Sequence, residues 1–185
     1  MTNINIIGDR EDFERELKKL TTEISLSDLI EYIKSEIAKI GCSDVYPCYV
    51  LIKNVGLTLR SNMGIQFASD LGGYTDPYSK KVFINLLGII TQLKQVYNKI
   101  SLLPKWVRPL LGAKRQEVAI QKMVHYMVVH EYRHVEQLLY MGDSAIPRVE
   151  TWETRSYYMN PMEWDAWLVQ CGIKLPLWVF FGPKG

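Results

Sequence analysis

Hydrophobic positions near the start of the chain recur at helical spacing. Phe13, Leu17 and Leu20 follow Asp9, a residue type that often caps helices. A clearer helix begins after Ser25 or Ser27 and stops at Gly41, a common terminator. Its apolar residues gather on one side: Leu29, Ile30, Ile33, Ile37 and Ile40. Residues 1–42 therefore predict two helices that support the rest of the fold.

The pattern then changes to one that is typical of strands. Four segments rich in β-branched and aromatic residues are separated by Gly, Asn and Asp: 47–55, 57–62, 64–69 and 80–86. They predict a small sheet. The stretch GGYTDPYSKK at residues 72–81 is interpreted as a turn that leads into the last strand, at 82–85.

Helical spacing returns in the second half of the chain. Residues 87–100 predict a helix, and the two prolines of PKWVRP break the chain after it. A long helix is expected from about residue 114 to 141, where Gly142 ends it.

The order of helices, strands and then helices favours an α+β fold. A chain of 185 residues, 48% hydrophobic and without a linker, is expected to form one domain.

Charge, cysteines and hydropathy restrict the partners and the compartment. The net charge of +2 does not indicate a particular class of partner. Residues 94–122 are basic, but such charges usually lie on a surface that contacts only water. We therefore do not expect nucleic-acid binding.

Three cysteines without a CxxC pair favour a reducing compartment. The first 20 residues lack a secretory signal, and the longest apolar run, LPLWVFF, is too short to span a bilayer. A cytoplasmic protein without a membrane span is predicted, and its oligomeric state is left open.

The stretch HEYRH at residues 130–134 carries the strongest chemical signal. On a helix, His130 and His134 lie on the same face one turn apart, so both imidazoles can bind one ion. Zinc binds imidazole well, and Glu131 could take a proton from a water on the metal. Chance is a poor explanation, because the composition predicts roughly 0.003 HExxH matches in the whole chain.

A third ligand is expected, because a catalytic zinc usually takes three protein ligands. The remaining histidine, His125, precedes His130 by five residues and should point about 140° away from it. The third ligand is therefore predicted to be a carboxylate or, as the less favoured choice, Cys171.

Glu163 is the favoured carboxylate. Asn160 can cap a helix and Pro161 suits its first position, so Glu163 would lie in the first turn of a rigid helix. Two alternatives stay open: Glu163 could serve only as the partner of the cap, or Asp165 could be the ligand. Small Ala166 would allow this helix to approach the metal helix closely.

HEYRH followed by NPMEWDA at residues 160–166 resembles the gluzincins, which are zinc metallopeptidases, and most of all their small minimal forms, the minigluzincins. The resemblance covers residues 80–172, which would form the catalytic core. It implies a zincin-like fold, in which a small sheet packs on the long helix. It also implies that His130, His134 and Glu163 bind zinc, and that Glu131 acts as the general base in peptide hydrolysis.

The resemblance also suggests how a substrate would bind. In this family a strand before the metal helix runs antiparallel to the bound peptide, and KKVFINL at residues 80–86 is either that strand or an ordinary strand of the sheet. The expected partner is thus a peptide or protein substrate. A non-catalytic binding or structural protein that retains the zinc-binding fold is the alternative.

Several further residues are candidates to support the site. Gln137, whose helical position is near the two histidines, could orient one of them. Thermolysin-like members have an Asp four residues after the ligand Glu, where this chain has Trp167; Asp165 is a candidate supporting residue, although on another face. Three residues before Asn160 are candidates to stabilise a tetrahedral intermediate: Arg155, Tyr157 and Tyr158.

Overall fold

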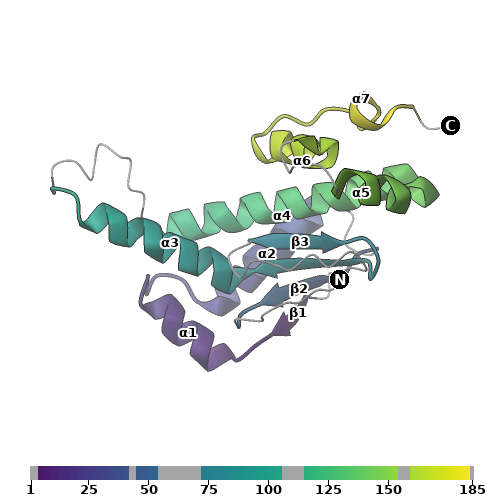
Figure 1. The fold of residues 1–185 in the computed structure, drawn as a ribbon. Coiled ribbons are helices and arrows are strands. Elements are labelled where there is room, and N and C mark those ends of the chain that lie inside the picture. The colour runs from purple at the N-terminus through teal and green to yellow at the C-terminus, as the bar shows by residue number, and fades with distance from the viewer. Residues whose placement is uncertain (1–3, 42–44, 54–71, 106–114, 154–158, 184–185) are drawn as a thin grey trace.

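The computed structural model describes residues 4–41, 45–53, 72–105, 115–153 and 159–183. These residues form an α+β fold with a four-stranded mixed sheet in the order β1-β2-β4-β3 (Figure 1). Strands β1 (Ile4–Ile7), β2 (Cys48–Leu51) and β4 (Lys81–Asn85) run parallel. Strand β3 (Gly73–Asp76) pairs antiparallel with β4 at the edge. The predicted α+β class is confirmed.

Two strands differ from the sequence prediction. β1 precedes the first helix, so the chain does not begin with helices as expected. β3 lies in the segment that was interpreted only as a turn, and the turn is confined to residues 77–80. Pairing with β4 explains β3, because neither Gly nor Asp favours strands by itself. The strands expected at 57–62 and 64–69 lie outside the described residues.

β4 is an interior strand. It pairs with β2 on one side and with β3 on the other. Its backbone groups are therefore already used within the sheet. Of the two alternatives for residues 80–86, the structure therefore supports an ordinary strand of the sheet, because an added peptide strand needs a free edge.

The first two helices begin and end at the expected signals. The Asp9 side chain accepts a hydrogen bond at the start of α1 (Arg10–Lys18). Ser25 and Asp28 form a reciprocal capping box at the start of α2 (Leu26–Ile40). Gly41 adopts a left-handed conformation, with φ of 80°, and closes α2. Together, α1 and α2 connect the parallel strands β1 and β2.

The later helices are arranged around one long helix. α3 (Leu86–Ser101) leads towards α4 (Gln116–Met141), whose 26 residues extend for about 39 Å. A short 3-10 helix η2 (Gly142–Ser144) and then α5 (Ala145–Glu153) follow. In Figure 1, α4 lies between the sheet and α6 (Pro161–Gln170), and α7 (Trp178–Phe181) lies near the C-terminus.

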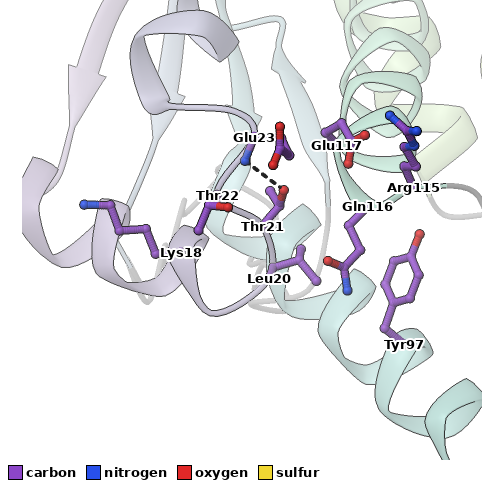
Figure 2. Close-up of a pocket in the computed structure, with 9 residues that line it drawn as sticks. All are labelled: Lys18, Leu20, Thr21, Thr22, Glu23, Tyr97, Arg115, Gln116 and Glu117. Carbon is purple, nitrogen blue, oxygen red and sulfur yellow. Dashed lines mark hydrogen bonds between the residues drawn. The ribbon is translucent and has the colours of Figure 1, made fainter.

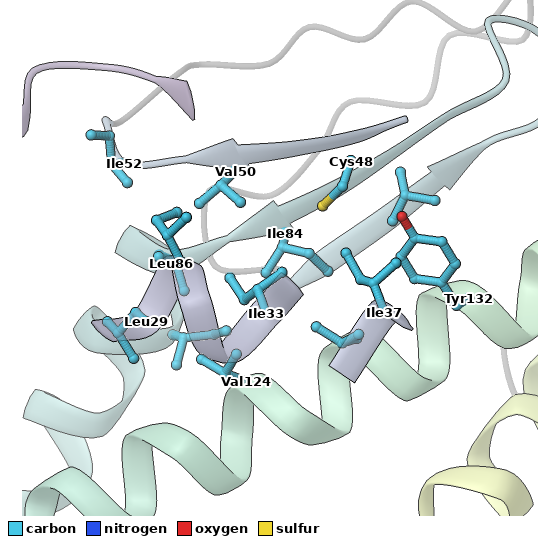
Figure 3. Packing of buried hydrophobic residues seen from close by; sticks show 14 of the residues in the cluster. Leu29, Ile33, Ile37, Cys48, Val50, Ile52, Ile84, Leu86, Val124 and Tyr132 are labelled. Carbon is cyan, nitrogen blue, oxygen red and sulfur yellow. The ribbon is translucent and has the colours of Figure 1, made fainter. Parts of the chain in front are cut away.

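The hydrophobic core fills the space between the sheet, α2 and α4 (Figure 3). One face of α4 supplies fully buried side chains at spacings of four and three residues: Ile120, Val124, Val128, Tyr132 and Val135. Each such side chain contributes roughly 1.5–3 kcal/mol by leaving water. The Tyr132 hydroxyl donates to the Tyr46 carbonyl at 3.3 Å, which satisfies its polar end. α4 is therefore held rigidly along its length.

A buried carboxylate joins α2 to α4. Glu36 is 5% exposed and lies 2.7 Å from Nδ1 of His125, and Lys39 also donates to it. Burial alone would raise the pKa of Glu36, but the hydrogen bonds and charges of Lys39 and His125 outweigh burial and hold the pKa below 4.5. His125 thus serves this contact, away from the other two histidines.

This contact predicts an acid-sensitive stability. The pKa of Glu36 is lower in the folded state than in the unfolded chain, where it is near 4.5. The ionised side chain therefore stabilises the folded state above pH 4.5, and this stabilisation is lost as the pH falls through the lowered pKa. Glu36→Gln is expected to cost about 1–3 kcal/mol at pH 7 and much less at pH 3. Urea unfolding from pH 7 to 3 measures this, with exposed Glu11→Gln as the control. Equal destabilisation at both pH values would contradict it.

Candidate metal centre

The second half of α4 buries polar side chains as well as apolar ones. His130 and His134 are each 7% exposed, and their Nε2 atoms lie 3.2 Å apart. The two rings meet edge to face, with centroids 4.8 Å apart. The i,i+4 spacing on α4 therefore aims both Nε2 atoms at one point.

α6 brings a carboxylate to the same point. Asn160 caps α6 by accepting from the Met162 N–H, and Pro161 is its first residue. One oxygen of Glu163 lies 3.2 Å from Nε2 of His130, and the other lies 3.5 Å from Nε2 of His134. α6 can approach α4 this closely because the Ala166 side chain is small and fully buried.

This donor set suits a divalent cation. The candidate ligand atoms of His130, His134 and Glu163 all lie within 4.8 Å of one another. Two nitrogens on one tetrahedral zinc, each about 2.05 Å from it, would be about 3.3 Å apart, and the two Nε2 atoms are separated by 3.2 Å. Two imidazoles and one carboxylate are ligands that zinc accepts, so the residues fit such an ion.

The charges of the three groups are strongly coupled. Burial would raise the pKa of Glu163, but the positive charge of His134 and the hydrogen bonds from both histidines hold it well below its usual range. Burial would lower the pKa of His134, but Glu163 opposes this and raises it to about 9. A metal must displace the proton on His134, so metal binding here should release protons and weaken at low pH.

Glu131 lies beside this cluster and faces β3. It is 5% exposed, and the Thr75 hydroxyl lies 2.9 Å from its Oε2 and 2.8 Å from its backbone oxygen. Burial is the main cause that raises the pKa of Glu131, and the nearby histidines and Thr75 oppose it only in part. A side chain at Gly73 would collide, because its Cβ would be 2.7 Å from Cγ of Glu131.

Gln137 and Asp165 lie behind His134. The Gln137 side chain is fully buried, with Oε1 at 2.8 Å from Nδ1 of His134 and Nε2 at 2.7 Å from Asp165. Asp165 is paired with Arg133 instead of facing the two histidines. Of the two acids left open as the third ligand, the structure therefore brings Glu163 to the histidines.

Other candidates lie elsewhere in the chain. Cys171, the less favoured choice for the third ligand, is exposed and is not part of the cluster. The candidate stabilisers of an intermediate lie outside the described residues: Arg155, Tyr157 and Tyr158. The sequence analysis missed Gly73 and Thr75, because no local pattern links them to HExxH. It also missed the role of Arg133, which lies inside HExxH but pairs with Asp165, 32 positions away.

A surface pocket of about 590 Å³ lies near the start of α4 (Figure 2). Its lining carries both signs of charge, from Lys18 and Arg115 and from Glu23 and Glu117. At 1.5 Å per residue, Gln116 at the start of the helix is about 20 Å from His130. The pocket is therefore separate from the candidate metal centre.

Comparison of the chain with protein-family models, curated proteins and solved structures gave no match. Among the described helices, none combines the length and the apolar character needed to cross a membrane.

Proposed function

We propose that the protein is a zinc-dependent peptidase with a zincin-like fold, similar to the gluzincins. One observation carries the proposal: the Nε2 atoms of His130 and His134 and the carboxylate of Glu163 converge within 4.8 Å. Two imidazoles and one carboxylate make up the ligand set of several zinc peptidases. A buried glutamate adjacent to the cluster provides the base that this chemistry requires.

The residues around the centre have distinct proposed roles. A zinc ion held by His130, His134 and Glu163 would supply Lewis acidity for activating water and polarising a carbonyl. Glu131 takes the proton from the attacking water and passes it to the leaving amine. Thr75 holds Oε2 of Glu131, so Oε1 is the oxygen to which we assign this proton. Burial raises the pKa of Glu131, which makes it a stronger base for this proton.

The edge strand β3, in place of β4, is the proposed binding strand for an extended peptide. The Asn85 N–H donates to the Gly72 carbonyl at 2.9 Å, which makes residues 72 and 85 a hydrogen-bonded pair. The alternation of an antiparallel ladder then turns the backbone groups of Gly73 and Thr75 away from β4. No described strand pairs with this outer edge. A peptide added there would lie beside Glu131.

Metal analysis of purified protein tests the centre. Wild type is expected to bind about one zinc per chain, because three ligands suffice for a tight site. His130→Ala, His134→Ala and Glu163→Ala should weaken binding by more than the roughly 10–100-fold that follows loss of an outer partner. The matched control is His125→Ala, which removes a histidine that contacts Glu36 instead. Wild-type affinity in Glu163→Ala would exclude Glu163 as a ligand.

Cleavage of a synthetic peptide library, followed by mass spectrometry, tests the activity. Zinc-loaded wild type is expected to produce defined cleavage sites, which a chelator removes and added zinc restores. Zinc uptake without cleavage anywhere in the library would contradict the peptidase proposal. That result would favour the alternative of a non-catalytic protein that retains zinc.

A further inference from the structure

Arg133 is buried in contact with α6, although it precedes His134 by one residue and touches none of the candidate ligand atoms. It is 3% exposed, and its guanidinium donates to Asp165 through Nε at 2.7 Å and through Nη2 at 3.0 Å. Its other contacts are Glu136 at 2.6 Å and the Leu175 carbonyl at 2.7 Å. Arginine stays protonated in proteins and only donates, so Asp165 is held as an acceptor.

The acceptor role of Asp165 sets the direction of the Gln137 amide. Nε2 of Gln137 donates to Asp165 at 2.7 Å and to the Met162 carbonyl at 2.9 Å. The reversed amide would place its oxygen against two other acceptors and its NH₂ group against His134. Both hydrogens of the NH₂ group are used in the observed direction, so the amide oxygen must face Nδ1 of His134.

The direction of the amide in turn selects the tautomer of His134. An amide oxygen can only accept, so Nδ1 of His134, at 2.8 Å, must carry a hydrogen. In the neutral ring, Nε2 then has the free lone pair, and this atom faces His130 and Glu163. Nδ1 of His130, by contrast, is buried without a hydrogen-bond partner among the described residues.

We propose that Arg133 is a positioning residue of the candidate metal centre. Through Asp165 it fixes the Gln137 amide, and through that amide it fixes the nitrogen that His134 offers to a metal. We call this chain of hydrogen bonds, from Arg133 through Asp165 and Gln137 to His134, the relay. Its role in metal binding rests on the proposed function, but the direction of its hydrogen bonds does not depend on an ion. The two histidines are thus held unequally: the protein orients His134 through this relay, and His130 has no equivalent partner among the described residues.

The test uses two variants and a matched control. Gln137→Leu removes the amide while keeping its approximate size. The double variant Arg133→Met/Asp165→Leu removes both buried charges together, because either charge left alone would be strongly destabilising. Arg148→Met, which removes an exposed arginine of α5, is the control. Thermal unfolding of each variant verifies that it folds.

The first measurement is NMR of the metal-free protein with ¹⁵N-labelled histidine. Wild type and the control should show a hydrogen on Nδ1 of His134 that exchanges slowly with water. The exchange of this hydrogen should be at least about 10-fold faster in the double variant, and Gln137→Leu should remove its protection from exchange altogether. A wild-type His134 without a protected Nδ1 hydrogen, or folded variants with unchanged exchange, would overturn the inference.

The second measurement is zinc affinity by competition with a fluorescent chelator. Gln137→Leu should bind zinc roughly 10–100-fold more weakly, as expected for loss of an outer partner. The double variant should lose about 10-fold, because the Met162 carbonyl still holds one amide hydrogen. Folded variants within twofold of wild type would overturn the role of the relay. If wild type itself bound no zinc, the proposed function would fail, and the NMR result would still decide the relay.

Discussion

Replacement of Glu131 by glutamine is expected to leave zinc bound and to lower peptide cleavage by about 10²–10⁴-fold. Glutamine has nearly the same size and can still bond to the Thr75 hydroxyl, so the position of the side chain should be kept. It cannot take a proton from water. Zinc content by metal analysis and the cleavage rate of a peptide identified in the library measure the two effects separately.

Glu117→Gln is the matched control for this experiment. It makes the same chemical change on the same helix, but about 20 Å from His130 along α4. The control should cleave at the wild-type rate. A Glu131→Gln variant that also did so would remove the general-base role from Glu131, whatever its zinc content.

Gly73→Ala is the second change with a large expected effect. The added Cβ would lie 2.7 Å from Cγ and 2.8 Å from Oε1 of Glu131, so either the side chain or β3 must move. A shift of about 1 Å in a catalytic group can cost about 10²-fold in rate. Zinc content should not change, because none of the proposed ligands touches Gly73. The cleavage rate and the metal content of the purified variant measure this.

The neighbouring Gly72→Ala provides a close control. Its Cβ would meet the thioether of Met127, the flexible end of a side chain that can turn aside. It should therefore retain most of the cleavage activity. If both variants lost cleavage activity equally, any change near the start of β3 would disturb the site. The predicted effect of the contact between residue 73 and Glu131 would then be contradicted.

Helices were predictable from the sequence because their signals are local. Asp9, Ser25, Gly41 and Asn160 lie at the helix ends that they were expected to mark. The short strands were harder, because β3 contains glycine and aspartate and forms through pairing with β4. Whether β4 lies inside the sheet or at its edge also depends on that pairing.

The residues of the candidate centre show the same difference between local signals and long-range contacts. The histidine pair follows from the spacing of one helix, and Glu163 follows from the caps of another. Thr75, in contrast, contacts Glu131 across 56 positions, and Arg133 meets Asp165 across 32. Such contacts depend on how β3 and α6 pack against α4, and residue type or spacing does not encode them.

One short helix, α6, delivers both Glu163 and Asp165 to α4. An ion bound at the centre would therefore act as a cross-link that closes a loop of roughly 30 residues. If α6 separated from α4, this cross-link would break. The contacts of Asp165 with Arg133 and Gln137 would be lost in the same event. Metal occupancy and the attachment of α6 to α4 would then form one cooperative unit, in which bound zinc suppresses local opening.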